Sequence, residues 1–210
     1  MNELRRFQPP LVAILRGLTL AEVQPLGRVL FDAGFRMVEV PLNRPAALAC
    51  IAALKAMAPA DALVGGGTML TPADVDTVHA VGGRLMVAPN CDAEVIGRAR
   101  ELGMLAAPGV ATPTEAFNAL RWGAHALKIF PADMVGPAGL KAFKSVLPAG
   151  TPLWPVGGVT PEGIATWVHA GATGFGIGGQ LFQPGVSPQV LAVRARAFIA
   201  AWASATPAAE

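Results

Sequence analysis

The chain has 210 residues, of which 53% are hydrophobic and 14% are charged, and its net charge is +2. The basic residues are scattered, which does not indicate a nucleic-acid interface. No apolar run reaches the roughly 18 residues that a membrane span needs, and no signal-peptide core follows the first residues. We therefore expect a cytoplasmic protein, in which the excess of apolar residues favours contact with other subunits.

Short apolar segments alternate with amphipathic segments along the whole chain. The expected strands cover residues 11–16, 37–42, 62–65, 84–89, 104–108, 126–130, 152–156 and 173–178. The expected helices cover residues 19–33, 45–57, 71–81, a segment ending at 102, residues 112–122, a segment ending at 147 after a loop rich in proline and glycine, residues 160–170 and 188–202. Residues 203–210 are expected to be frayed.

Eight βα units in 210 residues favour a closed (β/α)8 TIM barrel, a single α/β domain over residues 1–210. A doubly wound sheet would show the same alternation, but eight units in so short a chain favour the barrel. The strands are continuous apolar runs, which is typical of parallel strands covered on both faces. Active sites of such barrels lie at the carboxyl ends of the strands, so polar residues there are the candidates.

Lys128 is out of place in the sixth expected strand, because an unpaired lysine rarely enters an apolar run. The chain has three other lysines, and all lie in polar segments that are expected to be helical or loop-like: Lys55, Lys141 and Lys144. Burial lowers the pKa of a lysine, and a neutral lysine attacks carbonyl carbons. The alternative interpretation is an ion-paired or snorkelling lysine at the end of a strand.

Glu39 is the one acidic residue of fourteen that lies inside an apolar strand. A salt bridge to Lys128 across the barrel interior would account for both buried charges. The same pair also suits Schiff-base chemistry, in which the lysine attacks a ketone and the carboxylate, directly or through a water, moves the protons. Both interpretations remain open from the sequence.

Further candidates follow other expected strands. Arg16 is either a surface arginine or a clamp for a carboxylate. Gly66, Gly67 and Thr68 follow the third strand, and Pro89 and Asn90 the fourth. Two glycine pairs follow strands seven and eight, where barrels often bind phosphate on backbone N–H groups: Gly157 with Gly158, and Gly178 with Gly179. Tight turns are the alternative.

Histidine and cysteine do not form a recognisable metal or redox motif. The residues are His79, His125, His169, Cys50 and Cys91, and none has a partner at metal-ligand spacing. We interpret them as structural residues and expect neither a metal nor another cofactor.

Seven segments resemble the motifs of the class I keto-deoxy-phosphosugar aldolases, which act on 2-keto-3-deoxy-6-phosphogluconate and -6-phosphogalactonate. The resemblance covers nearly the whole chain in the right order. The segments are VAILR at 12–16, VEVPLN at 38–43, GGGT at 65–68, VAPN at 87–90, PGVATPTE at 108–115, LKIFP at 127–131 and PVGGV at 155–159. The resemblance implies a homotrimer of barrels that needs no metal and forms a Schiff base on Lys128.

Within the family the chain is more similar to the phosphogalactonate enzymes. Asn43 and Val156 stand where the phosphogluconate enzymes tend to have arginine and threonine. The two substrates are epimers at C4, and a threonine hydroxyl near C4 could hold one epimer by a hydrogen bond, whereas a valine could not. Gly179 stands where relatives usually have serine, so we expect either weaker phosphate binding or binding by backbone N–H groups alone.

The resemblance implies cleavage of 2-dehydro-3-deoxy-6-phosphogalactonate into pyruvate and glyceraldehyde 3-phosphate. Lys128 would form the iminium and Glu39 would move the protons. Substrate would be bound by Arg16, Thr68, Pro89 and Val156, and its phosphate by Gly157, Gly158, Gly178 and Gly179. The alternatives are a phosphogluconate or 4-hydroxy-2-oxoglutarate aldolase, a non-covalent phosphate-binding isomerase or synthase, and a catalytically silent barrel.

Overall fold

The strands of the computed structural model, which describes residues 3–206, are short and pair only in parallel. They are β1 (Leu11–Ile14), β2 (Met37–Pro41), β3 (Leu63–Gly67), β4 (Leu85–Val87), β5 (Leu105–Ala107), β6 (Gly109–Val110), β7 (Leu127–Ile129), β8 (Leu153–Pro155) and β9 (Phe175–Ile177). All their residues are buried, as expected of strands covered on both faces.

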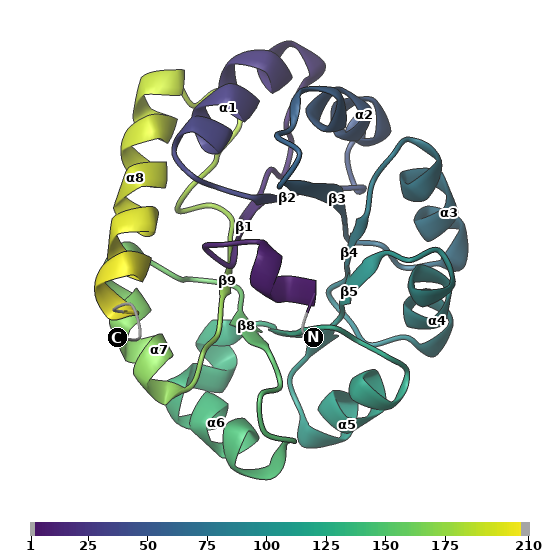
Figure 1. Cartoon of the computed structure of the whole chain (residues 1–210), viewed down its shortest axis with the longest axis vertical. Coiled ribbons are helices and arrows are strands. Elements are labelled where there is room, and N and C mark those ends of the chain that lie inside the picture. Colours follow the sequence, from purple (N-terminus) through teal and green to yellow (C-terminus); the bar gives the residue numbers. More distant parts are fainter. Residues whose placement is uncertain (1–2, 207–210) are drawn as a thin grey trace.

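Helices surround the strands (Figure 1). They are α1 (Leu20–Asp32), α2 (Ala47–Met57), α3 (Pro72–Ala80), α4 (Ala93–Glu101), α5 (Pro113–Arg121), α6 (Ala132–Val146), α7 (Ile164–Ala170) and α8 (Pro188–Ala205), with the 3-10 helices η1 (Glu3–Arg6) and η2 (Pro161–Gly163). Capping boxes begin α1, α3 and α5, and the box of α1 joins Thr19 to Glu22 as predicted. Within residues 3–206, no helix is both long and apolar enough to cross a membrane.

The strands form two curled parallel sheets. One has the order β5-β4-β3-β2-β1-β9, and the other has the order β6-β7-β8. Backbone contacts connect the sheets at both ends: the N–H of His125 donates to the carbonyl of Ala106 over 2.9 Å, and Val156 forms a bridge with Gly176. Figure 1 shows the strands following one another around a ring inside the helices. The predicted α/β class with parallel strands is confirmed.

The fifth expected strand, residues 104–108, corresponds to β5, and a short strand that was not predicted, β6, follows Pro108. Proline has no N–H to donate to a sheet. The residues before it, β5, pair with β4, whereas the residues after it, β6, pair with β7. The two strands therefore belong to different sheets. The expected strand is confirmed as β5, whereas β6 was not predicted.

Three helix boundaries also differ from the prediction. Helix α2 begins at Ala47 rather than at Pro45, because Ala46 takes a left-handed conformation with φ of 65°. The expected loop after residue 130 is instead the first turn of α6, which Gly136 interrupts at φ of 67°. Helix α8 continues to Ala205, so the chain is not frayed from residue 203, while residues 207–210 lie outside the described part.

Large apolar side chains fill the space enclosed by the strands at their amino ends. Residues of η1 and the segment after it, Leu4 and Phe7, join this cluster and cover that end. Trp154 of β8 lies in the same cluster and is 3% exposed. A second, larger core packs the outer faces of the strands against the helices. Because one end of the interior is filled, polar chemistry is confined to the carboxyl ends of the strands.

Candidate active site

Lys128 is the middle residue of β7, and its side chain is buried, with 7% exposed. Burial lowers the pKa of its ammonium group; the negative charge of Glu39 opposes this shift, and the positive charge of Arg16 adds to it. The Nζ atom lies over the ring of Phe130, 4.6 Å from the ring centroid. This aromatic face stabilises the charged amine without neutralising it.

Glu39 lies in β2 and is 2% exposed. Burial raises the pKa of its carboxyl group to about 7, although the charges of Lys128 and Arg16 act in the opposite direction. Its Oε2 atom is buried and has no hydrogen-bond partner. A carboxyl group with a pKa near 7 exchanges protons readily at neutral pH, which is the property of a general acid–base.

The carboxyl group of Glu39 packs against the backbone of Gly67. A Cβ atom at Gly67 would overlap with this carboxyl group, so any other residue there would displace it. Gly66 and Gly67 belong to β3, where they pair with Val40 and Pro41; they do not follow the strand as the sequence suggested. The glycines thus provide space for a carboxylate inside the strands rather than a loop.

The salt bridge between Glu39 and Lys128, which would have accounted for both charges, is not formed. Within residues 3–206, the ion pairs join Arg36 to Asp61, and Arg98 to Asp76 and Glu101. Glu39 rests on Gly67 and the amine of Lys128 lies over a ring, so each group has a separate place. The two groups influence each other through their charges and are not joined by an ion pair.

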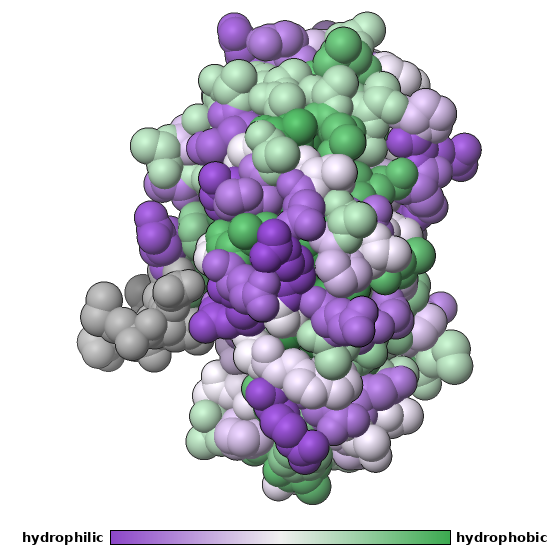
Figure 2. Space-filling model, turned by 90° about the vertical axis from the view of Figure 1, so that its right-hand side faces the viewer, coloured by the Kyte–Doolittle hydropathy of each residue, from purple (hydrophilic) through white to green (hydrophobic). Residues whose placement is uncertain are grey.

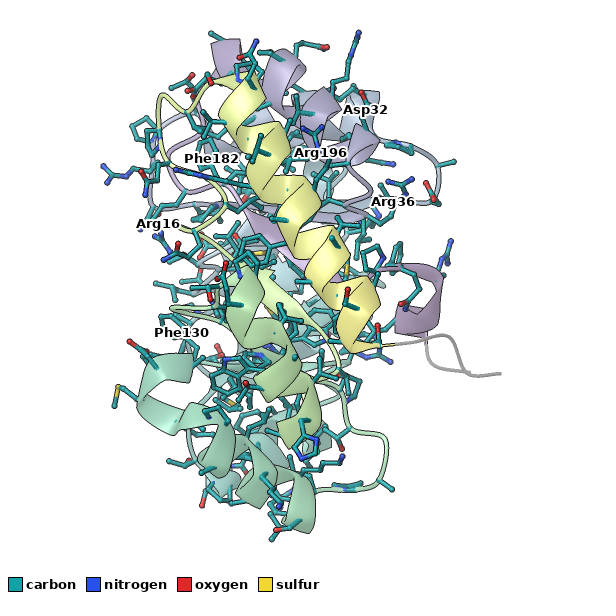
Figure 3. All side chains as sticks on the ribbon, turned by 90° about the vertical axis from the view of Figure 1, so that its left-hand side faces the viewer. Arg16, Asp32, Arg36, Phe130, Phe182 and Arg196 are labelled. Carbon is teal, nitrogen blue, oxygen red and sulfur yellow. The ribbon has the colours of Figure 1, made fainter. Side chains whose placement is uncertain are left out.

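The other candidates for the carboxylate end of a substrate surround this pair. Arg16 follows β1, is exposed, and is close enough for its charge to shift the pKa of both Glu39 and Lys128. Figure 3 shows Arg16 and Phe130 on the same side of the molecule, opposite Arg36. Thr68 follows β3 in a left-handed conformation, with φ of 54°. The carbonyl of Pro89 packs against Gly109, which pairs with Lys128.

The glycine pairs lie at the carboxyl ends of β8 and β9. Gly157 and Gly158 have φ of 113° and 66°, values that favour glycine, and they pack against the first turn of α6. Val156, just before them, is 7% exposed and contacts Gly176. Gly178 accepts hydrogen bonds from the N–H groups of Leu181 and Phe182, over 2.8 and 2.9 Å.

A cavity of about 620 Å³ opens beside Arg16, but its lining does not include Lys128 or Glu39. It lies at the starts of α1 and α2 and is lined by Arg16, Gly17, Leu18, Thr19, Leu20, Arg44, Pro45, Ala46 and Pro184. Because the buried pair is the chemically unusual feature, we place the candidate site at the pair and regard this cavity as its neighbour.

One histidine, His125, and both cysteines make hydrogen bonds to other parts of the protein. His125 accepts a hydrogen bond from the N–H of Ala106 and contacts Arg100. The thiols of Cys50 and Cys91 donate to the carbonyls of Leu18 and Glu115. In the described part of the chain, no group of three or more histidine, cysteine or acidic side chains is arranged to hold a metal ion.

Two residues of this region, Phe130 and Asp133, were not among the sequence candidates, and one contact between two candidates was not predicted. Phe130 could have been found, because it lies two residues after Lys128 and alternate residues of a strand share a face. The contact between Gly67 and Glu39 depends on how neighbouring strands are staggered. Asp133, which lies beside Gly157, gave no signal, since it was assigned to a loop.

Comparison with known proteins identifies the family. A sequence model described as "Aldolase: KDPG and KHG aldolase" matches residues 2–191. The chain belongs to the KDPG and KHG aldolase family. The resemblance to keto-deoxy-phosphosugar aldolases is thereby confirmed, and with it the assignment as an aldolase, a carbon–carbon lyase.

Individual relatives of this aldolase agree with the assignment. The 2-dehydro-3-deoxy-6-phosphogalactonate aldolase of Escherichia coli is 46% identical over 93% of this chain and 96% of its own. A solved structure described as "Native KDPGal structure" is also 46% identical, covers 94% of this chain and 96% of its own, and superposes with a TM-score of 0.92. The 2-dehydro-3-deoxy-phosphogluconate aldolase of Treponema pallidum is 34% identical over 60% of both chains.

We expect the variant Glu39→Gln to gain stability relative to the wild type as the pH rises through 7. The Glu39 carboxyl has a pKa raised from 4.5 to about 7, so between these values the folded aldolase binds more protons than the unfolded chain and loses stability as pH increases. The full shift corresponds to roughly 3 kcal/mol. Urea denaturation between pH 4.5 and 8.5 measures the difference.

A matched control is Glu94→Gln, on an exposed residue whose carboxylate makes no hydrogen bond or ion pair. Its stability difference from the wild type should stay nearly constant over the same range. If Glu39→Gln also keeps a constant difference, the carboxyl of Glu39 is not desolvated in the folded state.

Proposed function

We propose that this chain is a class I aldolase that cleaves 2-dehydro-3-deoxy-6-phosphogalactonate into pyruvate and D-glyceraldehyde 3-phosphate. The observation that carries the proposal is a buried lysine without an ion pair beside a buried carboxyl group whose pKa is about 7. Membership of the family supports the reaction type, and the name of the Escherichia coli relative supports the substrate.

In this proposal Lys128 attacks the C2 ketone as the neutral amine, and the carbinolamine loses water to form an iminium. The iminium accepts the electron pair of the C3–C4 bond once the C4 hydroxyl loses its proton. Glu39 takes that proton through a water molecule, and glyceraldehyde 3-phosphate leaves. The same carboxyl group then delivers a proton to C3 of the enamine, and hydrolysis releases pyruvate and the free lysine.

The surrounding residues bind the two ends of the substrate. Arg16 and the turn at Thr68 hold the carboxylate, since a guanidinium binds a carboxylate through two parallel hydrogen bonds. Pro89 borders the pyruvate end, and Val156 lies near C4. The phosphate is bound by backbone N–H groups of Gly157, Gly158, Gly178 and Gly179. The proposed steps use only protein side chains and water.

We further propose that the strands close into a (β/α)8 barrel and that residues 1–210 form one domain. The contacts between the two sheets at both ends support closure. Several large hydrophobic side chains are exposed, and Figure 2 shows patches of hydrophobic residues between polar ones on the face that carries α3 and α4. This surface supports a homotrimer, and we assign the enzyme to the cytoplasm.

Borohydride reduction in the presence of pyruvate tests the Schiff base. We expect the intact protein to gain one reduced pyruvate adduct, and peptide mapping to locate it on Lys128. The variant Lys128→Met should gain none, while Lys141→Met, which changes an exposed lysine of α6, should be labelled like the wild type. An unlabelled wild type that still binds phosphate would favour the non-covalent isomerase or synthase.

Rates on the two C4-epimeric substrates test the substrate assignment. We expect a higher kcat/KM for the phosphogalactonate epimer, and we expect Val156→Thr to shift the ratio toward the phosphogluconate epimer by roughly fivefold or more, because a hydrogen bond to C4 is worth ~1 kcal/mol. The control Val193→Thr changes an exposed valine of α8. Equal or faster cleavage of the phosphogluconate epimer by the wild type would refute the assignment.

A further inference from the structure

The first turn of α6 packs against the glycine turn that follows β8. The N–H of Ala132 donates to the carbonyl of Val156 over 2.9 Å, which ties the helix start to the end of the strand. At Gly157, the position of a Cβ atom would lie 3.5 Å from the nitrogen of Ala132 and 3.7 Å from Oδ1 of Asp133. At Gly158 it would lie 3.8 Å from Cβ of Asp133. The Asp133 side chain therefore borders both glycines.

Asp133 lies in the first turn of α6, and its negative charge has no cationic side chain within residues 3–206 as an ion-pair partner. Its carboxylate is exposed and makes neither a hydrogen bond nor an ion pair. A carboxylate only accepts hydrogen bonds, so it repels a phosphate dianion but can accept a hydrogen bond from a hydroxyl group. The hydrogen bond of Ala132 to Val156 fixes the backbone next to Asp133, which keeps this charge beside the turn.

The neighbouring turn after β9 offers no side chain that could offset this charge. No heavy atom lies within 4 Å of a Cβ atom placed on Gly179, and its φ lies outside the left-handed region, so a side chain would fit there. The glycine leaves only backbone groups, and its carbonyl accepts a hydrogen bond from Gln183 over 3.2 Å. The two turns together present backbone groups and one carboxylate, that of Asp133, which makes neither a hydrogen bond nor an ion pair in the described part of the chain.

We propose that Asp133 is a specificity-determining residue that weakens binding of the substrate phosphate and admits keto-deoxy sugar acids with a free hydroxyl at the same carbon. This inference rests on the proposed function, in which these two turns bind the phosphate. In the direction of synthesis, the corresponding acceptors are glyceraldehyde 3-phosphate and unphosphorylated glyceraldehyde. The aldolase uses both, and Asp133 reduces the preference for the phosphorylated one.

The experiment measures kcat/KM for each acceptor with saturating pyruvate. For Asp133→Asn we expect about a fivefold or greater increase with glyceraldehyde 3-phosphate, because the repulsion between the carboxylate and the phosphate dianion is removed. With glyceraldehyde the value should change by less than about twofold, since an amide carbonyl still accepts a hydrogen bond. Added salt should diminish the gain by screening the charges.

The matched control is Asp32→Asn, which removes the same charge from an exposed residue at the end of α1, on the side of the molecule opposite Arg16 (Figure 3). It should leave both values unchanged. A second variant, Gly179→Ser, should raise kcat/KM for the phosphorylated acceptor by adding a hydroxyl donor in open space.

Two results would overturn the inference: an unchanged ratio of the two acceptors in Asp133→Asn, or no turnover of glyceraldehyde by the wild type. Borohydride labelling with pyruvate, done on the same preparations, separates this failure from failure of the proposed function. A labelled Lys128 with an unchanged ratio refutes only the role of Asp133, whereas an unlabelled wild type refutes the aldolase mechanism itself.

Discussion

Two opposite charges are buried in this fold without forming an ion pair, and the arrangement of the site depends on that constraint. Burial disfavours the charged form of each group, so the pKa of the Lys128 amine falls and that of the Glu39 carboxyl rises. A direct ion pair would have held both groups in their charged forms. Separation keeps the amine available as a nucleophile and the carboxyl available for proton transfer.

The separation is built into the backbone around the pair. The carboxyl group occupies space that exists only because residue 67 is glycine, and the amine lies over the ring of Phe130, which directly follows β7. At the other end of the strands, Met37, Trp154 and the η1 segment fill the interior with apolar atoms. The buried polar pair thus lies apart from this apolar cluster.

Much of this candidate site could be predicted from the sequence, because Lys128 and Glu39 are charged residues within otherwise apolar segments. A lysine and a glutamate inside apolar runs indicate burial, and alternating strands and helices predict that both lie on parallel strands around one interior. Glycine pairs after the last two strands marked the remaining turns. Each of these signals lies within a few neighbouring residues, so the sequence alone was sufficient to select the candidate residues.

The features that could not be predicted depend on contacts between distant segments. The choice between an ion pair and two separate environments is decided by strand stagger, which brings Glu39 to Gly67. The short strand β6 after Pro108 is defined by its pairing with β7, which the sequence does not show. Asp133 lies beside the glycine turn after β8 because α6 starts soon after β7, where the composition of the segment indicated a loop.

The central claim is that Lys128 has a depressed pKa in the resting protein, and its direct test is an NMR titration of the lysine side chains. The chain has only four lysines, so each Nζ signal can be assigned with single variants. One signal, absent from Lys128→Met, should titrate well below the other three, and in Glu39→Gln it should move lower still because the opposing negative charge is lost. Four lysines titrating together near pH ~10.4 would contradict the claim.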